Sequence, residues 1–129
     1  MGFLIKKGLK QITKVFDNGQ ITDMASSSYL IALTSENINI VSIKLTANAA
    51  ITGYTSFTIT DSQSNLPVAH LNITSIADNY TFYFCIGYSA LTNQCGYNFK
   101  NSGNGLNIIA ETTPSTSATE LTIEINYFD

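Results

Sequence analysis

The chain has 129 residues, of which 44% are hydrophobic and only 12% are charged, and its formal net charge is −3. Ser, Thr and Asn together supply 42 residues and Ile supplies another 16, so small polar and β-branched side chains dominate. This composition excludes a chain disordered by charge excess, a coiled coil and a collagen-like repeat, and the length suits a single domain.

Positive charge is concentrated at the N-terminus, where four of the six Lys lie within the first 14 residues. We therefore expect residues 1–19 to form a basic amphipathic arm and residues 20–129 to form a mildly acidic sandwich domain. The apolar segment at residues 3–5 is too short for a secretory signal peptide, so none is expected. No apolar run reaches the roughly 18 residues that a membrane-spanning helix requires.

Residues 3–16 show the spacing of an amphipathic helix, which we expect here, with an extended arm ordered by a partner as the alternative. The apolar stripe is formed by Ile5, Leu9, Ile12 and Phe16. The lysine stripe is formed by Lys6, Lys10 and Lys14. The apolar stripe predicts docking to a partner, with the lysines facing an acidic surface. Capping of one end of the sandwich, contact with an anionic membrane surface and non-specific phosphate contact are the alternatives.

After the turn signal at residues 17–19, the chain alternates between apolar and polar residues as strands do. A slip in this alternation near Val41 and Ser42 predicts a β-bulge. The expected strands cover residues 29–33, 37–45, 51–59, 68–74, 80–88, 94–99, 106–112 and 121–127. The predicted fold class is all-β, a single antiparallel sandwich of jelly-roll or immunoglobulin-like topology with no second helix.

Half of the 14 aromatic residues lie between residues 80 and 99. The strand expected over residues 80–88 is apolar on both faces, which predicts that both faces are covered. It is either a central strand under a loop or under the N-terminal helix, or part of a subunit interface. The candidate interface residues are Tyr80, Phe82, Tyr83, Phe84, Tyr88, Tyr97 and Phe99. Cys85 and Cys95 either form a disulfide across adjacent strands or remain as two buried thiols.

No catalytic, metal or cofactor site is predicted, and we expect the chain not to be an enzyme. His70 is the only His and lies in an expected strand, without a nucleophile elbow nearby. One His and two Cys do not supply a tetrahedral zinc set, and the loop at residues 61–65 lacks the glycine and distal Glu of a calcium hand. The chain has no Arg and hence no bidentate phosphate clamp, so sequence-specific nucleic-acid recognition is not expected.

Two stretches of the chain carry a family resemblance. The first is VSIKLT at residues 41–46, leading to TSFTITD at residues 55–61. The second is LNIIA at residues 106–110, followed by a small-residue loop and the closing strand LTIEINY at residues 121–127. This layout resembles small structural proteins of bacteriophages, namely capsid-decoration, spike or fibre-base and tail-accessory sandwiches.

The resemblance implies a non-enzymatic virion subunit, assembled in the host cytoplasm, that works by shape and contact. Its partners would be other virion proteins and further copies of itself, and the arm would attach to a neighbouring subunit. The alternative is a ligand-binding sandwich module or adhesin, with glycans bound by loop Tyr and Asn residues. A Cys85–Cys95 disulfide in an exported chain would favour this alternative, whereas free thiols in a large assembly would favour the virion subunit.

Overall fold

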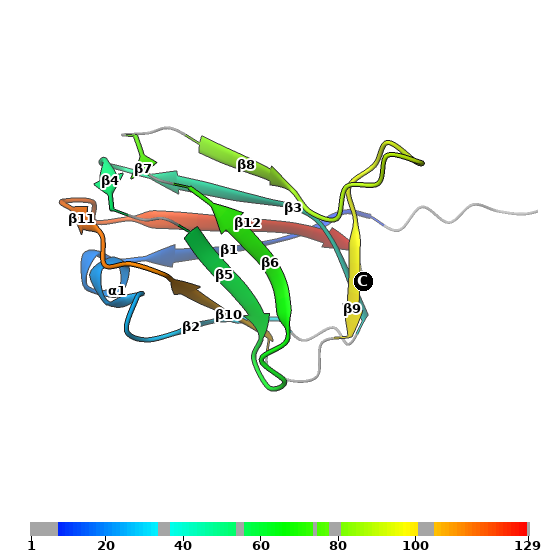
Figure 1. Ribbon diagram of the computed structural model, residues 1–129, viewed down its shortest axis with the longest axis horizontal. Helices are drawn as coiled ribbons and strands as arrows, with labels where there is room; N and C mark the ends of the chain where they lie inside the picture. Colours follow the sequence, from blue (N-terminus) through cyan, green and yellow to red (C-terminus); the bar gives the residue numbers. More distant parts are fainter. Residues whose placement is uncertain are drawn as a thin grey trace, which may run out of the picture.

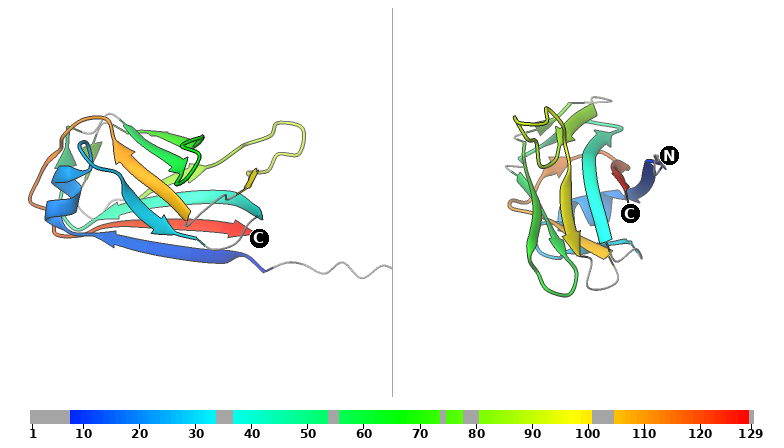
Figure 2. Two further views of the ribbon diagram at one scale, coloured as in Figure 1. Left: turned by 90° about the horizontal axis from the view of Figure 1, so that it is seen from below. Right: turned by 90° about the vertical axis from the view of Figure 1, so that its right-hand side faces the viewer.

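Two antiparallel sheets pack face to face, with one short helix at one end of the sandwich (Figures 1 and 2). The computed structural model describes residues 8–33, 37–53, 56–73, 75–77, 81–100 and 105–128, without the side chains of residues 99 and 100. This architecture confirms the predicted all-β sandwich class. The helix α1 spans Asn18–Asp23.

The first sheet, sheet A, has the strand order β1-β12-β3-β8, and β9 pairs with the other end of the long strand β3. Its strands are β1 (Lys10–Phe16), β12 (Leu121–Phe128), β3 (Asn37–Ala47), β8 (Thr81–Cys85) and β9 (Tyr97–Lys100). Sheet B has the order β2-β10-β5-β6 and consists of β2 (Tyr29–Ala32), β10 (Gly105–Ala110), β5 (Ser56–Asp61) and β6 (Pro67–Asn72). A small third sheet joins β11 (Ser115–Thr116), β4 (Ile51–Thr52) and β7 (Ser75–Ile76).

The eight main strands pair as if one long hairpin had been wound into a sandwich. Strand β1 pairs with β12, β2 with β10, β3 with β8, and β5 with β6. The additional pairings of β12 with β3 and of β10 with β5 complete the two sheets. Among these main strands, only β5 and β6 are consecutive neighbours within one sheet, so the other connections cross from sheet to sheet.

The core lies between the two sheets and is filled by alternate residues of each strand, as the period of two requires. Fully buried members include Phe16, Ile40, Ile43, Leu45, Phe57, Ile59, Ile108 and Ile125. Helix α1 and the turn after it contribute Ile21 and Met24, which are also fully buried. The main-chain amide of Ala110 donates to the Met24 carbonyl over 2.9 Å, which ties this turn to sheet B.

The predicted bulge in β3 is confirmed. Ile40 pairs with Tyr127 and Ser42 with Asn126, so Val41 is the extra residue. This insertion lets Ile38 and Ile40 face the core on one side of the bulge, and Ile43 and Leu45 on the other.

The single strand expected over residues 51–59 is instead divided into β4 and β5. Gly53 lies between them at φ +90°, a left-handed conformation that ends β4.

The helix expected over residues 3–16 is wrong for residues 10–16, which form strand β1 and pair with β12 along its whole length. The apolar stripe matched a helix, but β-branched residues such as Ile12, Thr13 and Val15 favour an extended chain that finds a partner strand. Residues 1–7 lie outside the described residues.

The helix in the described part begins at Asn18, within the range where a turn was predicted. The Asp17 side chain accepts a hydrogen bond from the Gln20 amide over 2.9 Å, and the Asp17 amide donates to Gln20 Oε1 over 3.0 Å. These two bonds form a capping box, a local signal for the start of a helix that the turn interpretation of residues 17–19 missed.

Candidate interaction surfaces

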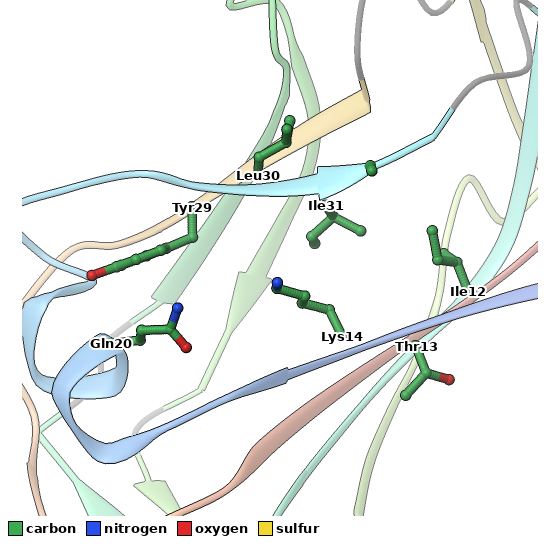
Figure 3. A pocket seen from close by; sticks show the side chains of 8 residues that line it. Ile12, Thr13, Lys14, Gln20, Tyr29, Leu30 and Ile31 are labelled. Carbon is green, nitrogen blue, oxygen red and sulfur yellow. The ribbon is translucent and has the colours of Figure 1, made fainter.

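A groove of about 450 Å³ lies between β1 and β2, the edge strands of the two sheets (Figure 3). Its lining is mainly apolar, with a few polar groups, as small binding clefts usually are. The lining residues are Ile12, Thr13, Lys14, Gln20, Tyr29, Leu30, Ile31 and Ala32. Both strands are edges within the described sheets, so the groove is bordered by main-chain groups that have no neighbouring strand there.

Lys14 is the cation of the groove because it occupies an inward-facing position of β1, between Ile12 and Phe16. Its Nζ atom lies 6.0 Å from the centroid of the Phe16 ring, within range of a cation–π interaction. An inward-facing lysine on an edge strand also disfavours unspecific pairing with other strands. Lys14 therefore places a positive charge in a groove whose lining is mainly apolar.

Tyr29 closes the groove at the helix end. Its hydroxyl donates to Asp23 Oδ2 over 2.8 Å, and its ring packs edge-on against Phe16 with centroids 5.9 Å apart. The hydrogen bond to Asp23 raises the pKa of Tyr29 above its ordinary value, and desolvation and the negative charges of Asp23 and Asp17 add to this. The neutral hydroxyl is thus held in place by the last residue of α1.

The structure does not bring the predicted docking stripe together on one face. Leu9 is exposed to 56%, Ile12 is half-buried against the core, and Phe16 is fully buried, so Phe16 is unavailable for docking. Lys10 is exposed and Lys14 is half-buried. The remaining two members of the stripes, Ile5 and Lys6, lie outside the described residues.

The aromatic cluster of residues 80–99 divides between the core and the surface. Phe82 and Phe84 pack against the core with their rings stacked 6.4 Å apart. Tyr83 points outward with 59% exposure, and Lys44 Nζ lies 5.7 Å from its ring centroid. The prediction that an N-terminal helix covers this strand is wrong. Residues 10–16 form strand β1, which lies at the edge of sheet A opposite β8. Tyr80 and the side chain of Phe99 lie outside the described part.

A hairpin formed by residues 86–96 extends beyond the sandwich at this edge (Figures 1 and 2). It is closed by a disulfide between Cys85 and Cys95, whose Cα atoms lie 5.5 Å apart. It carries Tyr88, exposed to 59%, and is followed by Tyr97, exposed to 38%. The disulfide, which the sequence left open, therefore joins two cysteines at a sequence separation of 10 and closes the connection into a loop.

Leu91, which is 99% exposed on this hairpin, was not among the interface residues predicted from the sequence. The signal was present in the sequence as an isolated apolar residue among small and polar residues between the two cysteines. Leu30, which lines the groove and is 44% exposed, was also absent from that prediction. Periodicity assigns an apolar residue to a core, whereas only the arrangement of strands shows that these two face solvent.

His70 lies on the outer face of sheet B, where its Nδ1 atom is 3.2 Å from the Thr58 hydroxyl. Within the described ranges, no group of three or more His, Cys, Asp or Glu side chains is arranged to hold a metal ion. None of the helices in the part of the chain that the structure describes is long and apolar enough to cross a membrane.

The strand order and the two packed sheets define the chain as an all-β sandwich protein. No protein-family model and no curated protein sequence matches it. A solved chain from the cyanophage Pam1 capsid asymmetric unit has a similar fold, with a TM-score of 0.55 at 10% identity over 99% of this chain and 89% of that chain. A chain from Bacillus endospore appendages, described as a novel family of disulfide-linked pili, gives a TM-score of 0.40 at 16% identity, over 95% and 90% of the two chains.

Proposed function

We propose that this chain is a non-enzymatic structural subunit of a bacteriophage virion, associated with its capsid or tail and assembled in the host cytoplasm. It would bind other virion proteins and further copies of itself through the sandwich and the N-terminal arm. The observation that carries the proposal is the exposure of large apolar side chains at both edges of sheet A. Leu9 and Val15 lie at the β1 edge, and Tyr83 and Tyr97 lie at the β8–β9 edge. We infer that these exposed groups at the two sheet edges are the surfaces through which the subunit contacts its partners.

The topology supports this proposal. From the pairing of β1 with β12, β2 with β10, β3 with β8 and β5 with β6 we infer a jelly roll, an architecture common in viral capsid domains. The fold similarity to a chain of the Pam1 capsid asymmetric unit spans nearly the whole chain and supports the same proposal. Because one fold hosts many functions, the exposed surfaces must carry the functional argument.

The arm contributes a shorter docking segment than the sequence predicted. Strand β1 holds residues 10–16 in sheet A, so we infer that the docking contacts of the arm come from the residues up to the start of β1. Ile5 and Leu9 would provide apolar contacts, while Lys6 and Lys10 would face acidic groups of the partner.

The proposal is tested by the native mass of the full chain in solution, measured by light scattering over a range of concentrations. We expect an oligomer whose stability falls when Leu9 is replaced by Asp. Leu66 is 65% exposed in the loop between β5 and β6, so Leu66→Asp serves as the matched control and should leave the mass unchanged. A chain that is monomeric at every concentration and does not bind purified virion subunits would contradict the proposal.

A second candidate function, a glycan-binding module or adhesin, is favoured by the disulfide-closed hairpin. Tyr88 is exposed there and its hydroxyl donates to Asn93 Oδ1 over 2.5 Å, which holds an aromatic face and an amide side by side. Jelly rolls also occur among lectins, and disulfides persist in oxidising compartments. A glycan array separates the two candidates, because a specific glycan signal that disappears in Tyr88→Ala would favour the second.

A further inference from the structure

We propose that the hairpin of residues 86–96 in one copy of the chain docks its tip residue, Leu91, into the β1–β2 groove of a second copy. The resulting contact is head-to-tail and repeats from copy to copy. This inference rests on the proposed self-assembly and names the two surfaces that would produce it.

The hairpin is already ordered before any contact forms. The disulfide between Cys85 and Cys95 closes its base, and the Gly96 amide donates to the Ile86 carbonyl over 2.7 Å. The Ser89 amide donates to the Gln94 carbonyl over 2.9 Å closer to the tip. A segment that is fixed in this way loses little conformational entropy on binding.

The chemistry of the tip favours a recess with apolar walls. Leu91 is 99% exposed, so almost its whole side chain can leave water on docking. Residues 86–96 contain no Lys, Arg, Asp or Glu, and so no charged side chain of the hairpin would be buried with it.

The groove offers this tip apolar walls and one cation. Its volume of about 450 Å³ lies within the range of small binding clefts, and Ile12, Leu30 and Ile31 supply apolar walls. Lys14 provides a cationic donor in the same groove (Figure 3), suited to the main-chain carbonyl oxygens and amide oxygens of an uncharged turn.

The two surfaces lie at opposite edges of sheet A, because β1 is one edge and β8 with β9 is the other (Figure 1). The hairpin therefore cannot fill the groove of its own chain, and the contact must join two copies. Since the two surfaces differ, the contact is heterologous and generates a ring if the rotation closes or a filament if it does not. The presence of a protruding apolar tip and an apolar groove on one chain is the reason to choose a second copy as the occupant.

The test uses a spin label on Thr92→Cys in an otherwise intact, disulfide-bonded chain, mixed with isotope-labelled wild-type chain. We expect enhanced relaxation of the amide signals of Ile12, Leu30 and Ile31 in the wild-type copy. The same label in a chain that also carries Leu91→Ser should produce no such enhancement. Enhancement elsewhere on the surface, or enhancement at the groove that persists in Leu91→Ser, would overturn the contact.

Light scattering of the same samples separates the contact from the broader proposal. If oligomers form without any relaxation effect at the groove, this contact is wrong and assembly through another surface stands. If all samples are monomeric and the groove signals are unaffected, both the contact and the self-assembly are wrong. Leu66→Ser is the control for loss of one exposed leucine and should retain the relaxation effect.

Discussion

Replacing Phe16 with Ala separates the two interpretations of the N-terminal segment. In a docking helix this residue would face a partner, and its loss would leave the isolated subunit as stable as before. In the structure Phe16 is the last residue of β1, is fully buried and packs edge-on against Tyr29 with ring centroids 5.9 Å apart. Its removal should therefore destabilise the isolated subunit.

The expected loss follows from the size of the cavity. Truncation of a buried Phe to Ala typically reduces the free energy of unfolding by about 3–5 kcal/mol. Part of this, about 0.5–1.5 kcal/mol, reflects the aromatic pair with Tyr29. Because β1 is an edge strand that can relax toward the core, we expect about 3 kcal/mol, and a fall in melting temperature on the order of 10 °C.

The assay is urea unfolding followed by circular dichroism at a concentration where the chain is monomeric. Val15 is the matched control, because it is the preceding residue of β1 and points outward, 48% exposed. Val15→Thr keeps the β-branched shape and should change the free energy of unfolding by less than about 0.5 kcal/mol. Equal stabilities of Phe16→Ala and Val15→Thr would refute the assignment of Phe16 to the core.

Reduction of the disulfide should speed hydrogen exchange throughout the hairpin of residues 86–96 and lower the free energy of unfolding by about 2–3 kcal/mol. Hydrogen exchange and urea unfolding, each with and without reductant, measure the two effects. Unchanged exchange in the hairpin would show that the disulfide does not stabilise it. Because the pKa of Tyr29 is raised in the folded chain, its contribution to stability is complete below its ordinary pKa and is lost as the pH rises through the folded value. Asp23→Asn should thus lower that pKa in a tyrosinate absorbance titration referenced to Tyr29→Phe, and an unaltered titration would show that the hydrogen bond does not form in solution. Gly105→Ala should destabilise the sandwich by about 1–3 kcal/mol, because Gly105 has φ +135° and an added Cβ would collide with the Ile31 carbonyl of β2. Gly8→Ala is the control, because there is open space around Gly8. Equal melting temperatures for the two variants would argue against the β2–β10 register.

The two edges of sheet A carry the two surfaces that we propose for assembly. The β1 edge carries the groove with Lys14, and the β8–β9 edge carries the closed hairpin with Leu91. Between them, the outer face of the sheet is a hydrogen-bonded polar surface, in which Lys44 and Glu124 lie 3.5 Å apart across β3 and β12. A partly exposed ion pair of this kind contributes little to stability.

Several features were determined by the sequence itself because they depend on local pattern. Alternation of Leu121, Ile123 and Ile125 with polar residues predicted β12 and its inward face, and all three are buried in the core. The slip in alternation near Val41 predicted the bulge for the same reason, since a one-residue insertion reverses the facing of all later side chains. The start of α1 was also encoded locally, in the capping box of Asp17 and Gln20.

Other features depended on contacts between residues far apart in the chain. Residues 10–16 match a helical stripe as well as a strand, and pairing with residues 121–127 at the far end of the chain decides for the strand. The Cys85–Cys95 bond requires the hairpin geometry between β8 and β9, which spacing alone leaves open. The groove exists only because the winding of the strands brings the edges β1 and β2 together, so its residues belong to segments whose separate patterns contain no trace of a shared surface. Local sequence thus determined which residues face inward on most strands, whereas tertiary pairing decided which strands became edges and what those edges expose.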